Sequence, residues 1–104
     1  MSYTDIEQMK LQNLIERFIP YLSKNDTSFI QRVFAQGLTP YKERLRQYGF
    51  TGSKRVMDAG CGYGQWTLAL AQEGVEVEAI DVGADRLMFL EAAAKALDLP
   101  NIAI

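Results

Sequence analysis

Apolar residues recur at helical spacing near the start of the chain. A capping-box pattern at Thr4–Glu7 precedes them, and the stripe runs to about Ile19, where Pro20 would end a helix. The sequence therefore predicts an amphipathic helix over this segment. Its apolar positions, at i, i+3, i+4 and i+7, are Leu11, Leu14, Ile15 and Phe18.

Two further apolar stripes predict two more helices before residue 52. One lies between residues 25 and 37, and carries Phe29, Ile30, Val33 and Phe34 on one face. The other begins with Thr39 as the cap and Pro40 at the first helical position, and it ends at Gly49. We expect residues 1–52 to form a helical cap.

The pattern changes in the second half, where short apolar runs alternate with helical stripes. Alternation of this kind predicts an α/β fold with a parallel, doubly wound sheet. We expect residues 53–104 to be the first half of a Rossmann-like sheet of strand order 3-2-1, in one compact unit with the cap. The expected strands are 56–57, 77–80 and 102–104, and the expected helices are 65–73 and a segment from Gly83 to Pro100.

A glycine-rich turn, Asp58–Gly64, joins the first expected strand to the helix that begins at Gln65. Such a turn lets a ligand lie against bare backbone at a helix N-terminus. The second expected strand ends in Asp81, at the distance of about 20 residues where a βαβ unit places a carboxylate on a bound ribose. The turn and the acid together predict a nucleoside-cofactor site.

The turn does not fit a dinucleotide. The fingerprint G-x-G-x-x-G/A would need glycine or alanine at position 65 or 67, and the chain has Gln65 and Thr67 there. Asp58 would also stand beside a bound pyrophosphate, and two like charges about 4 Å apart in a partly desolvated site repel by about 4 kcal/mol. The same carboxylate would attract a cation.

The pattern acidic-x-Gly-x-Gly-x-Gly, with an acid after the second strand, resembles motif I and the following acidic position of class I S-adenosylmethionine-dependent methyltransferases. Their cofactor carries an ammonium and a sulfonium but no phosphate. The resemblance implies that the glycines underlie the methionine part, Asp58 lies near the amino group, Asp81 takes the ribose hydroxyls and Val82 lies beside the adenine. The implied cofactor-binding residues are Asp58, Gly60, Cys61, Gly62, Gly64, Asp81 and Val82.

Some of these residues also have a purely structural interpretation. Gly60 and Gly64 could serve only a tight turn and close helix packing. Nothing near Cys61 in the sequence would lower the pKa of its thiol, so we expect a small buried residue rather than a nucleophile. Tyr63 and Trp66 are expected to pack rather than to stack on a ligand.

Composition narrows the chemistry. The 104 residues are 48% hydrophobic and 23% charged, an ordinary soluble globular mixture. One cysteine and no histidine leave no internal disulfide, no zinc cluster and no histidine base. No signal-peptide or membrane-spanning pattern is present, so a cytoplasmic location is expected.

Charge is divided unevenly along the chain. Residues 1–57 hold nine Lys or Arg and five Asp or Glu, whereas residues 58–104 hold two and eight. We expect the charges of the two halves to complement each other. A nucleic-acid partner is not expected, because the overall pI is near 5.0. The expected acceptor is a small molecule, and no membrane contact is expected. The cations that could contact an acidic substrate are Lys42, Arg44, Arg46, Lys54 and Arg55.

The leading hypothesis is that the chain is the N-terminal, cofactor-binding portion of a methyltransferase that stops after the third strand and has little activity alone. No catalytic residue or metal ligand is assigned, and the acceptor is not specified. The alternatives are a non-catalytic nucleoside-binding or interaction module completed by another chain, and a nucleotide-dependent oxidoreductase. An open edge on the first strand, residues 55–58, predicts a homodimer through that edge.

Overall fold

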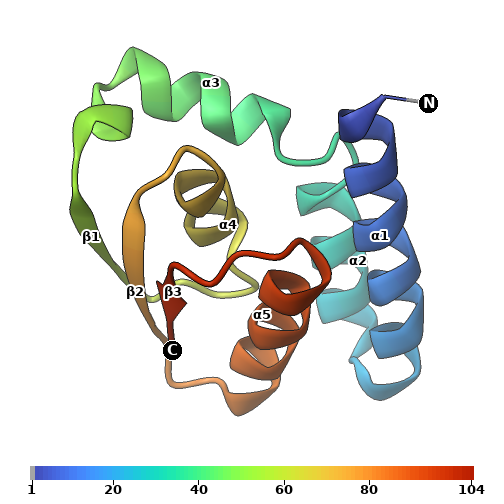
Figure 1. Ribbon diagram of the computed structural model, residues 1–104. Coiled ribbons are helices and arrows are strands. Elements are labelled where there is room, and N and C mark those ends of the chain that lie inside the picture. The colour runs from blue at the N-terminus through green and yellow to red at the C-terminus, as the bar shows by residue number, and fades with distance from the viewer. Residues whose placement is uncertain (1) are drawn as a thin grey trace.

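Three α-helices precede the sheet in the computed structural model, which describes residues 2–104 (Figure 1). They are α1 (Tyr3–Phe18), α2 (Lys24–Val33) and α3 (Thr39–Gln47). Short 3-10 turns follow α1 at Ile19–Tyr21, which contains Pro20, and α3 at Phe50–Gly52. The three helices predicted from the apolar stripes are confirmed.

Two of the predicted helix caps are wrong. The N-cap of α1 is Ser2 rather than Thr4: the Ser2 hydroxyl accepts from the Asp5 N–H and the Asp5 carboxylate accepts from the Ser2 N–H, each at 3.2 Å. Thr39 is the first residue of α3, and the cap position is Leu38, which makes no side-chain capping bond. The sequence pattern locates a helix start to within a residue or two, whereas the backbone geometry decides which residue caps it.

Strands and helices alternate in the rest of the chain, so the predicted α/β class and parallel sheet are confirmed. The strand β2 pairs in parallel with both β1 and β3, with Asp58 opposite Ala79 and Val77 opposite Ile102. The neighbour order is β1-β2-β3, which places β2 in the centre. The elements are β1 (Arg55–Ala59), α4 (Gln65–Gln72), β2 (Glu76–Ile80), α5 (Ala84–Ala96) and β3 (Ile102–Ala103).

The elements stack in layers behind the sheet. Figure 1 shows α4 and α5 next to the strands, α1 and α2 side by side beyond α5, and α3 crossing above α4. The ring of Phe89, on α5, lies at the centre of the core that these layers share. Its centroid is 5.3 Å from that of Phe18 and 5.7 Å from those of Phe34 and Tyr63. The glycine-rich turn is thus tied to the N-terminal helices through one aromatic cluster.

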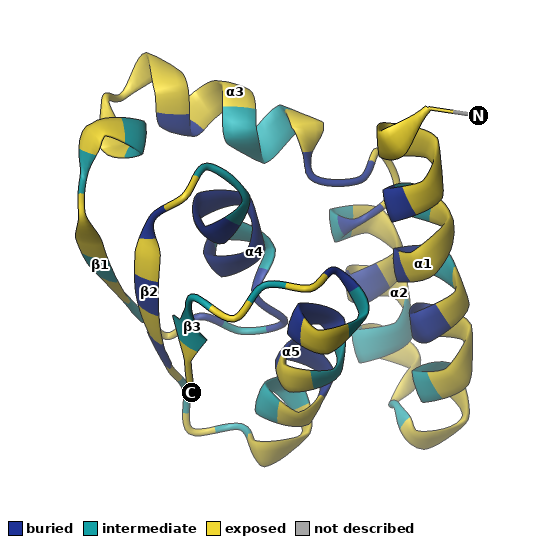
Figure 2. Ribbon diagram, in the orientation of Figure 1, coloured by how far each residue is buried: buried dark blue, intermediate teal, exposed yellow. Residues whose placement is uncertain are grey.

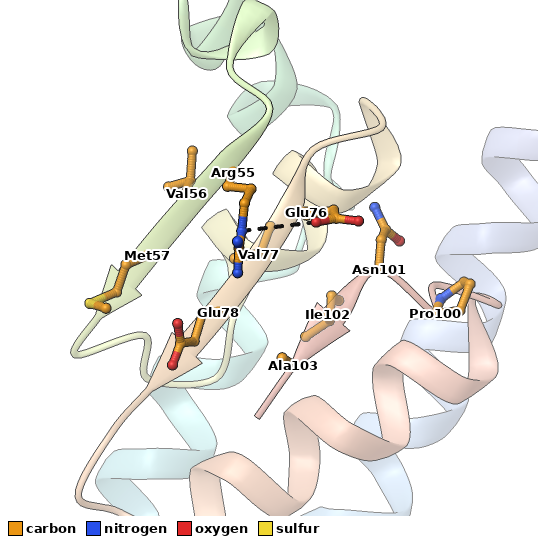
Figure 3. Close-up of a pocket in the computed structure, with 10 residues that line it drawn as sticks. All are labelled: Arg55, Val56, Met57, Glu76, Val77, Glu78, Pro100, Asn101, Ile102 and Ala103. Atoms are coloured by element: carbon orange, nitrogen blue, oxygen red, sulfur yellow. Dashed lines mark ion pairs between the residues drawn. The ribbon is translucent and has the colours of Figure 1, made fainter.

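Within residues 2–104, helices cover one face of the sheet (Figure 2). Val77 and Ala79 are buried toward the helices, whereas Glu76 and Glu78 are exposed on the other face. That other face carries a shallow hollow of about 410 Å³, where Arg55 lies 4.0 Å from Glu76 (Figure 3). Alternating burial is typical of a sheet covered on one side. The second helical layer of a doubly wound sheet stays a prediction.

The outer edge of β1 has no partner strand among the residues that the structure describes. Its backbone N–H and C=O groups on that side are available to another strand. Self-association through this edge, and the division of the chain at residue 52, stay predictions.

Candidate cofactor-binding site

The glycine-rich turn folds back on the carboxyl end of β2. The N–H groups of Gly60 and Cys61 both donate to the Ile80 carbonyl, at 2.7 and 3.0 Å. The Gly62 N–H donates to the Asp81 carboxylate at 2.8 Å. The turn therefore lies between Asp58, the next-to-last residue of β1, and Asp81, the residue that follows β2. The arrangement that the sequence predicted is present.

The three glycines of the turn have different structural roles. All have positive φ, but a Cβ on Gly60 or Gly62 would meet no atom within 4 Å. A Cβ on Gly64, at φ +91°, would lie 2.3 Å from Leu90 Cδ1 of α5. Gly64 is therefore needed for close helix packing, as its structural interpretation predicted, whereas Gly60 and Gly62 leave open space above the backbone.

Asp58 is half-buried at the end of β1, and its carboxylate is held from one side. The Thr67 hydroxyl donates to Asp58 Oδ2 at 2.7 Å. No other hydrogen bond or ion pair reaches Asp58 from the described part of the chain, so its Oδ1 oxygen has an open acceptor site. An unpaired carboxylate oxygen beside a glycine turn can accept bonds from an ammonium group.

Asp81 has more partners than the sequence suggested. Besides Gly62, the N–H of Gly83 donates to it at 2.7 Å and the Arg86 Nε at 3.3 Å, and its side chain is only 8% exposed. These donors, led by Gly83 and then Gly62, hold the pKa of the Asp81 carboxyl below its usual value. Arg86, 38% exposed, is the one side-chain donor among these partners.

Arg86 was missed because nothing local in the sequence marks it. It reaches back over Gly83, where a Cβ would lie 2.7 Å from the Arg86 Nε. Gly83 leaves room for Arg86 to reach Asp81, but this role can be recognised only when the path of the chain at Gly83 is known.

The lowered pKa of Asp81 implies that the free energy of unfolding depends on pH. Its ionised form contributes stability that is fully present above the unfolded-state pKa of about 3.9 and lost as the pH falls through the folded-state pKa. We expect Asp81→Asn to lower the free energy of unfolding by about 1.5–3 kcal/mol at pH 7, because the carboxylate accepts three bonds. The difference should shrink below pH ~4, as measured by urea unfolding at each pH.

Asp85→Asn is the matched control, since Asp85 is exposed in the first turn of the same helix. It should change stability by less than about 0.5 kcal/mol at any pH. An Asp81→Asn deficit that persists undiminished into acid would contradict the assignment.

The side chains of Cys61 and Tyr63 in the turn are packed in the interior. Cys61 is buried, and burial, with the charges of Asp58 and Asp81, raises the pKa of its thiol to about 11. It is not an activated nucleophile, as expected. Tyr63 is buried against Phe89, and the rings of Trp66 and Tyr41 meet edge-on at 4.9 Å.

Val82, two residues after the end of β2, differs from these residues because it is 99% exposed. An apolar side chain in this position is free to contact a ligand. Among residues 2–104 no cluster of three or more His, Cys, Asp or Glu could hold a metal ion, and no helix there is long and apolar enough to cross a membrane.

The chain is similar to two curated proteins. It is 33% identical over 95 residues to an uncharacterized RNA methyltransferase of Protochlamydia amoebophila (strain UWE25), a match that covers 91% of this chain and 20% of that protein. It is 40% identical over 55 residues to a protein of Geobacillus sp. (strain WCH70) that is provisionally named a methyltransferase. This match covers 53% of this chain and 22% of that protein.

These matches relate the chain to methyltransferases, so the resemblance inferred from the glycine motif is confirmed at that level. The matched parts span only about a fifth of each relative's length. Neither a family model nor a solved structure matches the chain.

Proposed function

We propose that the chain forms the cofactor-binding part of a class I methyltransferase that uses S-adenosylmethionine. The observation that carries the proposal is the placement of Asp58 and Asp81 on the two sides of one glycine turn, at the carboxyl ends of adjacent parallel strands. In open parallel sheets this edge is where ligands bind. The relationship to proteins named as methyltransferases supports the same function.

In the proposed complex each residue has a separate task. The free oxygen of Asp58 accepts from the cofactor's ammonium, and the open backbone at Gly60 and Gly62 accommodates the methionine part. Asp81 accepts from the ribose hydroxyls after Arg86 moves, and exposed Val82 lies against the adenine. When Arg86 moves, Asp81 keeps the bonds from the Gly62 and Gly83 N–H groups, so its carboxylate stays paired.

The cofactor would supply a methyl group already activated by its sulfonium. The chain's part is then to bind, orient and exclude water rather than to supply a nucleophile, which agrees with the raised pKa of the Cys61 thiol. No base is proposed within the chain.

We propose a small molecule as the methyl acceptor. Two of the cations that could contact an acidic substrate face acidic partners away from the turn, Arg46 with Glu73 at the end of α4 and Arg55 with Glu76 at the start of β2. These pairs reduce the positive charge open to a polyanion. RNA is the alternative acceptor, because the relative from Protochlamydia amoebophila carries RNA methyltransferase in its name.

Isothermal titration with S-adenosylhomocysteine, NAD and ATP in parallel tests the proposal. We expect S-adenosylhomocysteine to bind best, and Asp81→Ala to weaken it by about 1–3 kcal/mol, the cost of leaving charged hydrogen bonds unmade. Asp85→Ala, on the exposed side of α5, is the control that should bind normally.

Preferential NAD binding would support the oxidoreductase alternative. Absence of any nucleoside binding, in the chain and in a longer protein that contains it, would support an interaction module instead.

A further inference from the structure

Thr67 is buried at the start of α4 with its hydroxyl aimed at the turn. The residue is completely buried, and its Oγ1 donates to Asp58 Oδ2 at 2.7 Å. A buried hydroxyl needs a partner, and in a helix it usually finds the carbonyl four residues back. Here the hydroxyl bonds instead to a carboxylate nine residues back, on a different element.

The bond determines how Asp58 faces the site. With Oδ2 held by Thr67, the carboxylate cannot rotate freely, and Oδ1 is left as the acceptor. Asp58 also lies near the N-terminus of α4, whose dipole favours a negative charge there. A carboxylate that is already oriented loses less conformational entropy when a cation binds to it.

We propose that Thr67 is a positioning residue that orients Asp58 toward the ammonium group of the cofactor's amino-acid part. The inference rests on the proposed function and adds a residue that contacts no ligand itself. It makes a selective prediction: Thr67 matters only for ligands that carry the ammonium group.

Two ligands and two variants test this selectivity by isothermal titration. S-adenosylhomocysteine carries the ammonium, whereas 5′-methylthioadenosine has the same nucleoside and sulfur without it. Thr67→Val keeps the side-chain shape but removes the hydroxyl, and should weaken S-adenosylhomocysteine about 3- to 10-fold, the value of one hydrogen bond. It should leave 5′-methylthioadenosine unchanged. Thr67→Ser, which keeps the hydroxyl, should restore most of the affinity for S-adenosylhomocysteine.

A double-mutant cycle separates positioning from a packing effect. In an Asp58→Ala background, Thr67→Val should cause little further loss, because the group that Thr67 orients is already gone. If Thr67→Val fails to fold, Thr67→Ala replaces it in the same cycle, since alanine is the residue most favourable to a helix.

Equal weakening of both ligands, or no change for either, would overturn the role of Thr67 while the unmodified protein still bound S-adenosylhomocysteine. If the unmodified protein bound neither ligand, the proposed function would fail first, and the role of Thr67 with it. Binding of S-adenosylhomocysteine to the unmodified protein therefore distinguishes a failure of the Thr67 role from a failure of the proposed function.

Discussion

Gly64→Ala is expected to destabilise the fold by about 2–5 kcal/mol. Alanine would have to adopt φ near +91°, at a cost of about 1–2 kcal/mol, and its Cβ would lie 2.3 Å from the buried Leu90 side chain. Overpacking a filled core adds about 1–3 kcal/mol. Because small domains have only about 5–15 kcal/mol in total, urea unfolding should show a large fall in the midpoint.

Gly60→Ala is the matched control in the same turn. It has φ +73° but no atom within 4 Å of the added Cβ, so only the backbone cost of about 1–2 kcal/mol should appear. If the two variants lost equal stability, the contact between Gly64 and Leu90 would not be the source of the effect.

The 104-residue chain by itself is expected to transfer methyl groups at least about 10³-fold more slowly than a longer protein that contains it. Effective positioning of two reactants contributes about 7–11 kcal/mol to enzymatic rates, and under the proposed function these residues bind only the cofactor. Asp58 also lines a shallow, mostly apolar hollow of about 310 Å³ beside the open edge of β1. An acceptor there would be exposed to water. The lining residues are Leu45, Tyr48, Phe50, Val56, Met57, Asp58, Trp66 and Leu70.

The measurement uses tritium-labelled S-adenosylmethionine with small-molecule nucleophiles in one assay and total RNA in another. Binding of S-adenosylhomocysteine to both proteins is the control that separates lost binding from lost positioning. Turnover by the 104-residue chain at about 1 s⁻¹ or faster, the ordinary range for enzymes, would contradict the prediction.

Local patterns in the sequence predicted the elements and their order. The spacing of apolar residues distinguished helices from strands, and the glycines marked the turn between the first strand and its helix. Because parallel strands present their carboxyl ends at one edge, the positions of Asp58 and Asp81 after successive strands were enough to predict that both lie at that edge. These features depend on contacts between residues close in sequence, or on general rules of sheet topology.

The tertiary structure alone decided which side chains hold those acids. Thr67 orients Asp58 and Arg86 covers Asp81, and neither contact follows from spacing, since each depends on rotamers and on how the turn packs against a neighbouring element. The need for Gly64 likewise arises from Leu90, 26 residues away in sequence, approaching within contact distance. Such long-range packing is set by the whole core at once, so no local window of sequence contains it.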